Sequence, residues 1–123
     1  MYKLMIVDDS NIIRSKIHRA HDADIFEVVA VAGSGVEALN MYKQYKPDVV
    51  TMDLTMPHMD GIECIEKLCE LNPDVLILVV SALSDEATGI EALQKGASGF
   101  LLKPFSEEEL RNALLELTDV DYV

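Results

Sequence analysis

The chain has 123 residues, half of them hydrophobic, and carries a formal net charge of −12. This length and composition predict a single domain, residues 1–123, whose core needs no disulfide or structural metal. The negative charge repels phosphate backbones and anionic lipids, so direct binding to nucleic acid or to a membrane is not expected. No run of about 18 apolar residues occurs, and no transmembrane helix is predicted.

The N-terminus and the cysteines predict a reduced, cytoplasmic protein. The first apolar run ends in two aspartates, which the apolar part of a secretory signal would not contain. Cys64 and Cys69 are five positions apart on a predicted helix, so they point to different sides of it and cannot easily bridge. We interpret both as small hydrophobic residues rather than as redox or metal-binding groups.

Five short apolar runs alternate with helix-like segments along the chain. The runs are rich in Val, Ile and Leu without strict alternation with polar residues, which is typical of strands covered on both faces. They span residues 4–7, 28–32, 49–52, 75–80 and 100–102. An α/β fold is therefore predicted, with one parallel sheet, helices on both faces and right-handed crossovers.

The helical segments carry recognisable start signals. Ser34 and Ser106 each precede a glutamate by three positions, as in a capping box, and Asp60 precedes Glu63 in the same way. The segment 85–95 is the weakest predicted helix because Thr and Gly stand at its centre.

Each apolar run stops at polar residues suited to a phosphoryl group. The carboxyl ends of parallel strands lie along one edge of a sheet, so these residues should share a crevice. They are Asp8 and Asp9, Gly33 to Gly35, Asp53, Ser81 and Lys103.

Three carboxylates in one crevice predict a bound cation. Asp8 and Asp9 alone would be interpreted as caps of the helix that starts near Asn11. A third aspartate at the end of a central strand changes this, because burying a charge there is costly. Crowded carboxylates stay ionised at pH 7 only beside a compensating cation. Oxygen ligands without His or Cys indicate Mg²⁺.

Asp53 stands alone at its strand end and is the candidate nucleophile, which would form an acyl phosphate. The metal and Lys103 would stabilise charge on the phosphoryl oxygens, and the Ser81 hydroxyl would contact the attached group. A lysine at a strand end is usually solvated. Pro104 favours a directed side chain here, since an X-Pro bond, cis or trans, can fix the direction of the preceding residue.

These residues resemble the receiver domain of two-component response regulators, over essentially the whole chain. Each motif alone is weak, but their order and spacing together are specific. The motifs are Asp8-Asp9-Ser10 with Arg14, residues 47–53, residues 56–61, Ser81-Ala82, Gly96-Ala97 and Lys103-Pro104-Phe105. The stretch 51–61 is most similar to chemotaxis (CheY-like) receivers and to the receiver of chemotaxis methylesterases.

The resemblance implies a flavodoxin-like, five-stranded sheet in the order 2-1-3-4-5. Asp53 would be the phosphoacceptor, Asp9 would bind Mg²⁺ directly, and Asp8 would act largely through water. The backbone carbonyl of Thr55 would be a further ligand of the metal. The phosphodonor would be a histidine kinase or a phosphotransfer protein, or a small donor such as acetyl phosphate.

The resemblance also implies a switch through Ser81 and Phe100. The serine hydroxyl moves toward the phosphoryl group, the ring at position 100 turns inward, and the surface of the last two helices and the fifth strand is reshaped for a protein target. Family members often have Thr and Tyr at these two positions, so here the readout would be steric. Thr55 and Leu83 would tune the lifetime of the acyl phosphate, with Leu83 hindering the attacking water.

Three alternatives compete with a signalling phosphoacceptor that is not a metabolic enzyme. A phosphatase of the haloacid dehalogenase type needs a second acid two positions after the nucleophile, where this chain has Thr55. A flavodoxin-like cofactor module needs a phosphate loop, which Asp8 and Asp9 would repel. A receiver used only for docking would not need the complete acceptor site. A monomer is expected, and weak dimerisation remains open.

Overall fold

The computed structural model describes residues 1–54, 59–82 and 86–118. Within these ranges, strands and helices alternate along the chain. The strands are β1 (Tyr2–Val7), β2 (Phe26–Ala32), β3 (Val49–Met52), β4 (Leu76–Ser81) and β5 (Gly99–Leu102). The helices are α1 (Asn11–Ala20), α2 (Gly35–Tyr45), α3 (Gly61–Leu71), α4 (Glu86–Gln94) and α5 (Glu107–Leu117). None of these helices is both long and apolar enough to cross a membrane.

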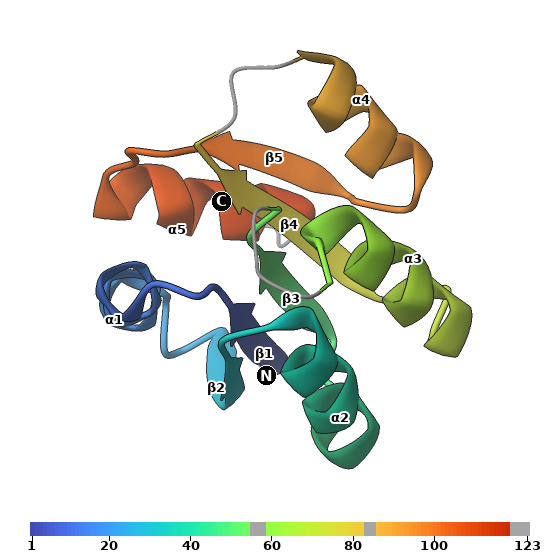
Figure 1. The fold of residues 1–123 in the computed structure, drawn as a ribbon. Coiled ribbons are helices and arrows are strands. Elements are labelled where there is room, and N and C mark those ends of the chain that lie inside the picture. Colours follow the sequence, from blue (N-terminus) through green and yellow to red (C-terminus); the bar gives the residue numbers. More distant parts are fainter. Residues whose placement is uncertain (55–58, 83–85, 119–123) are drawn as a thin grey trace.

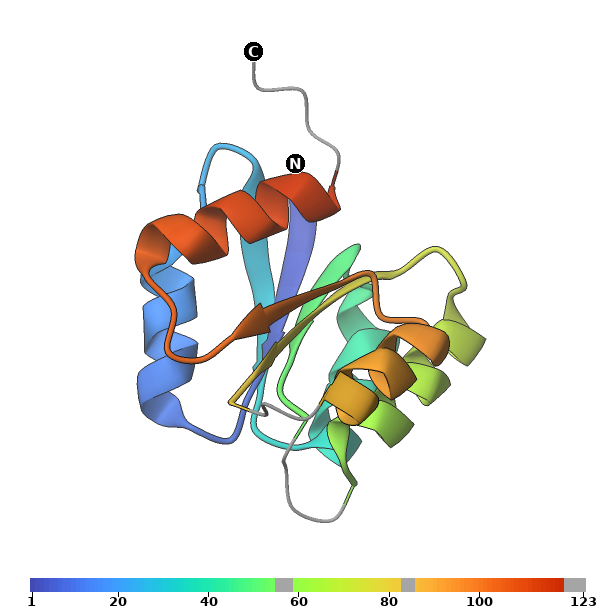
Figure 2. The same cartoon turned by 90° about the horizontal axis from the view of Figure 1, so that it is seen from above.

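The strands form one five-stranded sheet in the order β2-β1-β3-β4-β5, and all the pairs are parallel. Helices α1 and α5 cover one face, and α2, α3 and α4 cover the other (Figures 1 and 2). The predicted fold class and strand order are therefore confirmed. β1 and β2 each begin two residues before the predicted apolar runs, because pairing continues into Tyr2 and Phe26.

Two hydrophobic cores lie on the two faces of the sheet. Successive side chains of a strand point to opposite faces, so Leu4 and Ile6 enter the core under α1 and α5, whereas Met5 and Val7 enter the core under α2, α3 and α4. The same alternation determines toward which face of the sheet the polar side chains at the strand ends point.

The helix starts follow local side-chain chemistry. Ser106 and Glu109 form a complete capping box, and Ser34 and Asp60 accept hydrogen bonds from the backbone N–H groups of Glu37 and Glu63. Helix α1 is capped by Ser10, whose hydroxyl accepts from the N–H of Ile13 at 3.3 Å. The helix therefore does not need Asp8 or Asp9 as a cap.

Both cysteines are free thiols. Cys64 lies in the core under α2, α3 and α4. Burial raises the pKa of the Cys64 thiol to about 12, and the charges of Glu63 and Asp60 add to this. Burial also raises the pKa of Cys69. Both groups are thus protonated at neutral pH, which makes them poor nucleophiles and metal ligands.

Replacing Thr51 of β3 by valine should make the protein more stable. Its side chain is 1% exposed, and its hydroxyl has no hydrogen-bond partner within the described ranges. An unpaired buried hydroxyl is unfavourable, so the nearly isosteric Thr51→Val change should raise the free energy of unfolding by about 1 kcal/mol. Urea denaturation measures this value, with Thr51→Ser as the control that keeps the hydroxyl. A less stable valine variant would contradict the prediction.

Candidate functional site

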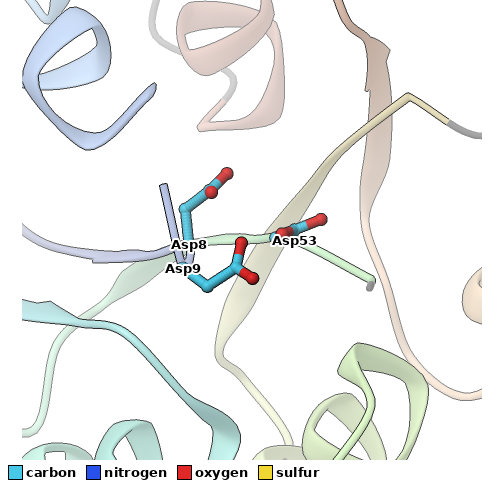
Figure 3. A group of neighbouring side chains, drawn as sticks. All are labelled: Asp8, Asp9 and Asp53. Atoms are coloured by element: carbon cyan, nitrogen blue, oxygen red, sulfur yellow. The ribbon is translucent and has the colours of Figure 1, made fainter. Parts of the chain in front are cut away.

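Asp8, Asp9 and Asp53 come together at the carboxyl ends of two neighbouring strands. Asp8 and Asp9 follow β1, Asp53 follows β3, and the N–H of Asp53 donates to the carbonyl of Val7 at 3.0 Å. One carboxylate oxygen of each aspartate lies within 4.8 Å of the others (Figure 3). Asp8 and Asp53 are 1% and 2% exposed, whereas Asp9 is exposed. The predicted cluster therefore has two buried members and one that solvent can reach.

Asp8 is held by four hydrogen bonds. Its backbone N–H donates to the carbonyl of Ala32 at 3.0 Å, and its carbonyl accepts from Arg14 Nη1 at 2.9 Å. Its carboxylate accepts from the N–H of Ser10 at 2.9 Å and from Lys103 Nζ at 2.8 Å. Both carboxylate oxygens of Asp8 therefore already accept a hydrogen bond from the protein.

Lys103 reaches back from the end of β5 into the acidic pocket. Its ammonium lies 2.8 Å from Asp8 Oδ2 and 3.8 Å from Asp53 Oδ1, and its side chain is 16% exposed. Its backbone N–H donates to the carbonyl of Ser81 at 2.9 Å, and the Lys103–Pro104 peptide bond is cis. The lysine is directed into the pocket, with Asp8 as its nearer partner.

Ser81 and Phe100 lie on the face of the sheet covered by α4. Val79 pairs with Phe100 and belongs to the core of that face, so the side chain of Ser81, two positions further, begins on the same face. Ser81 is fully buried, and Phe100 is partly buried against the same core. A Cβ on Gly89 of α4 would lie 3.5 Å from Cε2 of the Phe100 ring. The two residues are diagonal neighbours beside α4.

The donor set fits a small, hard, divalent cation. Among the described residues, Asp8, Asp9 and Asp53 form a group of carboxylates that lie close enough together to hold a metal ion. All of the donor atoms in this group are oxygens. Three carboxylates face one ammonium, which leaves an excess of two negative charges. Mg²⁺ prefers such oxygen ligands and would balance that excess. The predicted Thr55 ligand, and Leu83, lie outside the described residues.

Two cations on α1 contact the loops that carry the site, and sequence reasoning did not assign them roles. Arg14 donates to the carbonyl of Asp8, and Lys16 Nζ donates to the carbonyl of Phe105, two positions after Lys103. The Lys16 ammonium also lies 4.6 Å from the centroid of the Phe105 ring. Contacts to backbone carbonyls have no sequence signature, although the lack of acidic residues on α1 is visible in the sequence.

Together, the fold and the pocket define a class of protein. It is a doubly wound α/β domain with a cluster of carboxylates that could hold a metal ion, and a lysine directed at that cluster, at the carboxyl edge of its sheet. Residues 4–115 match the family described as the response regulator receiver domain. The chain belongs to this family, as its motifs predicted.

Its relatives include chemotaxis proteins. The chemotaxis protein CheY of Listeria monocytogenes is 40% identical over 114 residues, which cover 93% of this chain and 96% of that protein. CheY of Thermotoga maritima is 39% identical over 112 residues, covering 91% and 93% of the two chains. The resemblance to CheY-like receivers is therefore confirmed.

Solved structures agree with the fold. A CheY from Borrelia burgdorferi, in a complex with CheX, BeF3 and Mg²⁺, superposes with a TM-score of 0.90 at 30% identity, covering 98% of this chain and 90% of that one. The response regulator domain of Thermotoga maritima CheB gives a TM-score of 0.84 at 33% identity, covering 98% of each chain.

Proposed function

We propose that this receiver domain takes up a phosphoryl group on Asp53 in a Mg²⁺-dependent reaction and thereby changes its binding to a protein target. The donor is a phosphohistidine of a histidine kinase or phosphotransfer protein, or a small acyl phosphate. The observation that carries this proposal is the buried Asp53 carboxylate, held within 4.8 Å of the Asp8 and Asp9 oxygens and 3.8 Å from the Lys103 ammonium.

The residues of the pocket have separable roles in the transfer. A carboxylate oxygen of Asp53 attacks phosphorus, the bond from phosphorus to the donor nitrogen or oxygen breaks, and the leaving group takes that electron pair. Lys103, held at the pocket by Asp8, places a positive charge 3.8 Å from an Asp53 carboxylate oxygen, where it would stabilise charge on the oxygens of the transferred phosphoryl group. Resetting occurs when water attacks phosphorus, which releases inorganic phosphate and restores the Asp53 carboxylate.

Asp8, Asp9 and Asp53, with the backbone carbonyl of Thr55, would hold Mg²⁺. When bound, this ion supplies positive charge that neutralises the phosphoryl oxygens. Asp9 is exposed and suits direct ligation. Both Asp8 oxygens already accept hydrogen bonds, from Ser10 and Lys103, which supports a role for Asp8 through water.

We infer that Ser81 and Phe100 transmit the modification to the surface. Both lie on the α4 face, and the ring of Phe100 lies beside Gly89 of α4, where a Cβ would meet it at 3.5 Å. A new charge on Asp53 would draw the Ser81 hydroxyl and shift the population of ring positions. The exposed apolar residues Ile90 and Leu93 on α4, and Leu102 on β5, support this surface as the docking site of the target.

We propose further that residues 1–123 form one receiver domain that acts in the cytoplasm. It is monomeric or weakly dimeric and catalyses only its own phosphorylation and dephosphorylation. A phosphatase of the haloacid dehalogenase type would instead turn over a phosphomonoester such as p-nitrophenyl phosphate repeatedly.

Incubation with acetyl phosphate, followed by intact-mass measurement, tests the proposal. With Mg²⁺ we expect the mass to rise by one phosphoryl group per chain, and with EDTA we expect no change. No adduct in the presence of Mg²⁺ would favour a domain used only for docking, and catalytic release of phosphate from a phosphomonoester would favour the phosphatase alternative.

The same samples test the switch. NMR of the Phe100 ring protons should show a shift on phosphorylation in the wild type and a smaller shift in Ser81→Ala, because the hydroxyl that couples the two positions is absent. An equal shift in both proteins would remove Ser81 from the switch without affecting the acceptor role of Asp53.

A further inference from the structure

The side chain of Arg14 contacts the backbone of the loop that carries Asp8 and Asp9. It projects from the first turn of α1 and is half-buried. Its Nη1 donates to the backbone carbonyl of Asp8 at 2.9 Å, and its Nη2 donates to Oδ1 of Asn11. The carbonyl that Arg14 binds belongs to the peptide group that joins Asp8 to Asp9. The contact therefore holds the backbone from which both carboxylate side chains extend.

Gly33 provides the space that the guanidinium occupies. A Cβ at this position would lie 2.8 Å from Arg14 Nη1, closer than carbon and nitrogen normally approach. Gly33 directly follows β2, whose last residue, Ala32, accepts the backbone hydrogen bond of Asp8 at 3.0 Å. The guanidinium is therefore placed between the ends of β1 and β2, and both groups of the Asp8 backbone are bonded.

We propose that Arg14 is a positioning residue for the cation site: its hydrogen bond to the Asp8 carbonyl fixes the Asp8–Asp9 peptide plane, and Gly33 is the residue that makes room for it. This inference rests on the proposed function, because it concerns Mg²⁺ at the same pocket.

The geometry explains why the peptide plane matters. The side chain of Asp8 is held by Ser10 and Lys103, whereas Asp9 is exposed. The direction in which the Asp9 side chain leaves the backbone depends on the peptide plane just before it. A planar guanidinium with donors in a fixed fork can bind that carbonyl and the Asn11 oxygen together, which a single ammonium cannot do with the same geometry.

Arg19, on the same helix, provides the matched comparison. Its side chain is 66% exposed, and its charged partner is Glu107 at 4.0 Å. An exposed pair at this distance contributes little. Removing the charge of Arg19 changes the net charge by the same amount as removing that of Arg14, without touching the Asp8–Asp9 loop.

Isothermal titration with MgCl₂, on chains that carry no other change, tests the inference. Groups that support metal ligands typically change affinity by about 10- to 100-fold when mutated. We expect Arg14→Lys and Arg14→Gln to weaken Mg²⁺ binding about 10-fold or more, and Arg19→Gln to leave it within about 2-fold. The Arg14→Lys variant keeps the positive charge, so weaker Mg²⁺ binding in this variant would result from the changed geometry of the hydrogen bonds.

Gly33→Ala tests the same contact with arginine still at position 14. The added methyl group would displace the flexible end of the arginine, so we expect Mg²⁺ binding to weaken in this variant as well. Melting temperatures without metal, recorded in parallel, separate positioning from stability: weaker binding at an unchanged metal-free melting temperature supports positioning.

Two results would overturn the inference: wild-type affinity in both Arg14→Lys and Gly33→Ala, or losses of affinity that simply follow losses of metal-free stability. Failure of the wild-type chain to bind Mg²⁺ would be a different result, because it would refute the proposed function itself.

Discussion

The Asp53→Asn variant should fold and should take up no phosphoryl group from acetyl phosphate in the presence of Mg²⁺. Asparagine has nearly the shape of aspartate, but its amide is not a nucleophile toward phosphorus. The backbone hydrogen bond from position 53 to the carbonyl of Val7 is unaffected. Lys103 keeps its nearer partner, Asp8, at 2.8 Å, so no buried ammonium is left unpaired.

The same variant should respond differently to Mg²⁺ in unfolding experiments. A ligand present at about 100 times its dissociation constant raises the free energy of unfolding by about 2.7 kcal/mol. The wild-type chain should show a rise of this kind in Mg²⁺ titrations of its urea denaturation. Asp53→Asn should show a smaller rise, because one of the three carboxylates is replaced by a neutral ligand.

Asp60→Asn is the matched control for both measurements. It makes the same chemical change at an exposed position, where asparagine caps a helix as well as aspartate does. It should be phosphorylated and stabilised by Mg²⁺ like the wild type. An adduct that survives in Asp53→Asn would assign the phosphoryl group to another residue and leave docking as the better account of this domain.

Gly61→Ala should be the most damaging of the conservative changes at the site. Gly61 is the first residue of α3, and its N–H donates to the carbonyl of Leu54 at 3.0 Å. A Cβ there would lie 2.3 Å from the carbonyl oxygen of Asp53 and 2.6 Å from the Cα of Leu54. Both are backbone atoms, so relief requires the helix start or the end of β3 to move.

We expect this change to lower the free energy of unfolding by about 3 kcal/mol, at the upper end of the range typical of overpacked cores. Because the displaced backbone carries the phosphoacceptor, the rate of phosphorylation by acetyl phosphate should fall as well. Urea denaturation and intact-mass time courses measure the two effects.

Gly89→Ala serves as the control for Gly61→Ala. Its Cβ would lie 3.5 Å from the Phe100 ring, which is ordinary van der Waals contact. Alanine is favoured over glycine within a helix by about 1 kcal/mol, so this variant should be as stable as the wild type or more stable. Equal stability of Gly61→Ala and the wild type would show that the backbone at the end of β3 yields easily.

Much of the fold was visible in the sequence because its signals are local. Unbroken runs of Val, Ile and Leu predicted strands covered on both faces, and the polar residue after each run marked the edge of the sheet. This pattern predicted that Asp8, Asp9, Asp53, Ser81 and Lys103 stand at that edge, which is where the strands end. The strand order, by contrast, came from the resemblance to receiver domains and not from the composition or spacing of the residues.

The sequence by itself therefore determined which residues stand at the edge of the sheet, and only the tertiary structure determined how they meet. Asp8 and Lys103 are 95 positions apart, and no spacing rule shows that Asp8 lies nearer to the ammonium than Asp53 does. The contact of Arg14 with a backbone carbonyl, and the close approach of Gly61 to the end of β3, were equally hidden. The physical reason is that side-chain direction and backbone proximity depend on how helices pack across the sheet, and periodicity within one element does not record that packing.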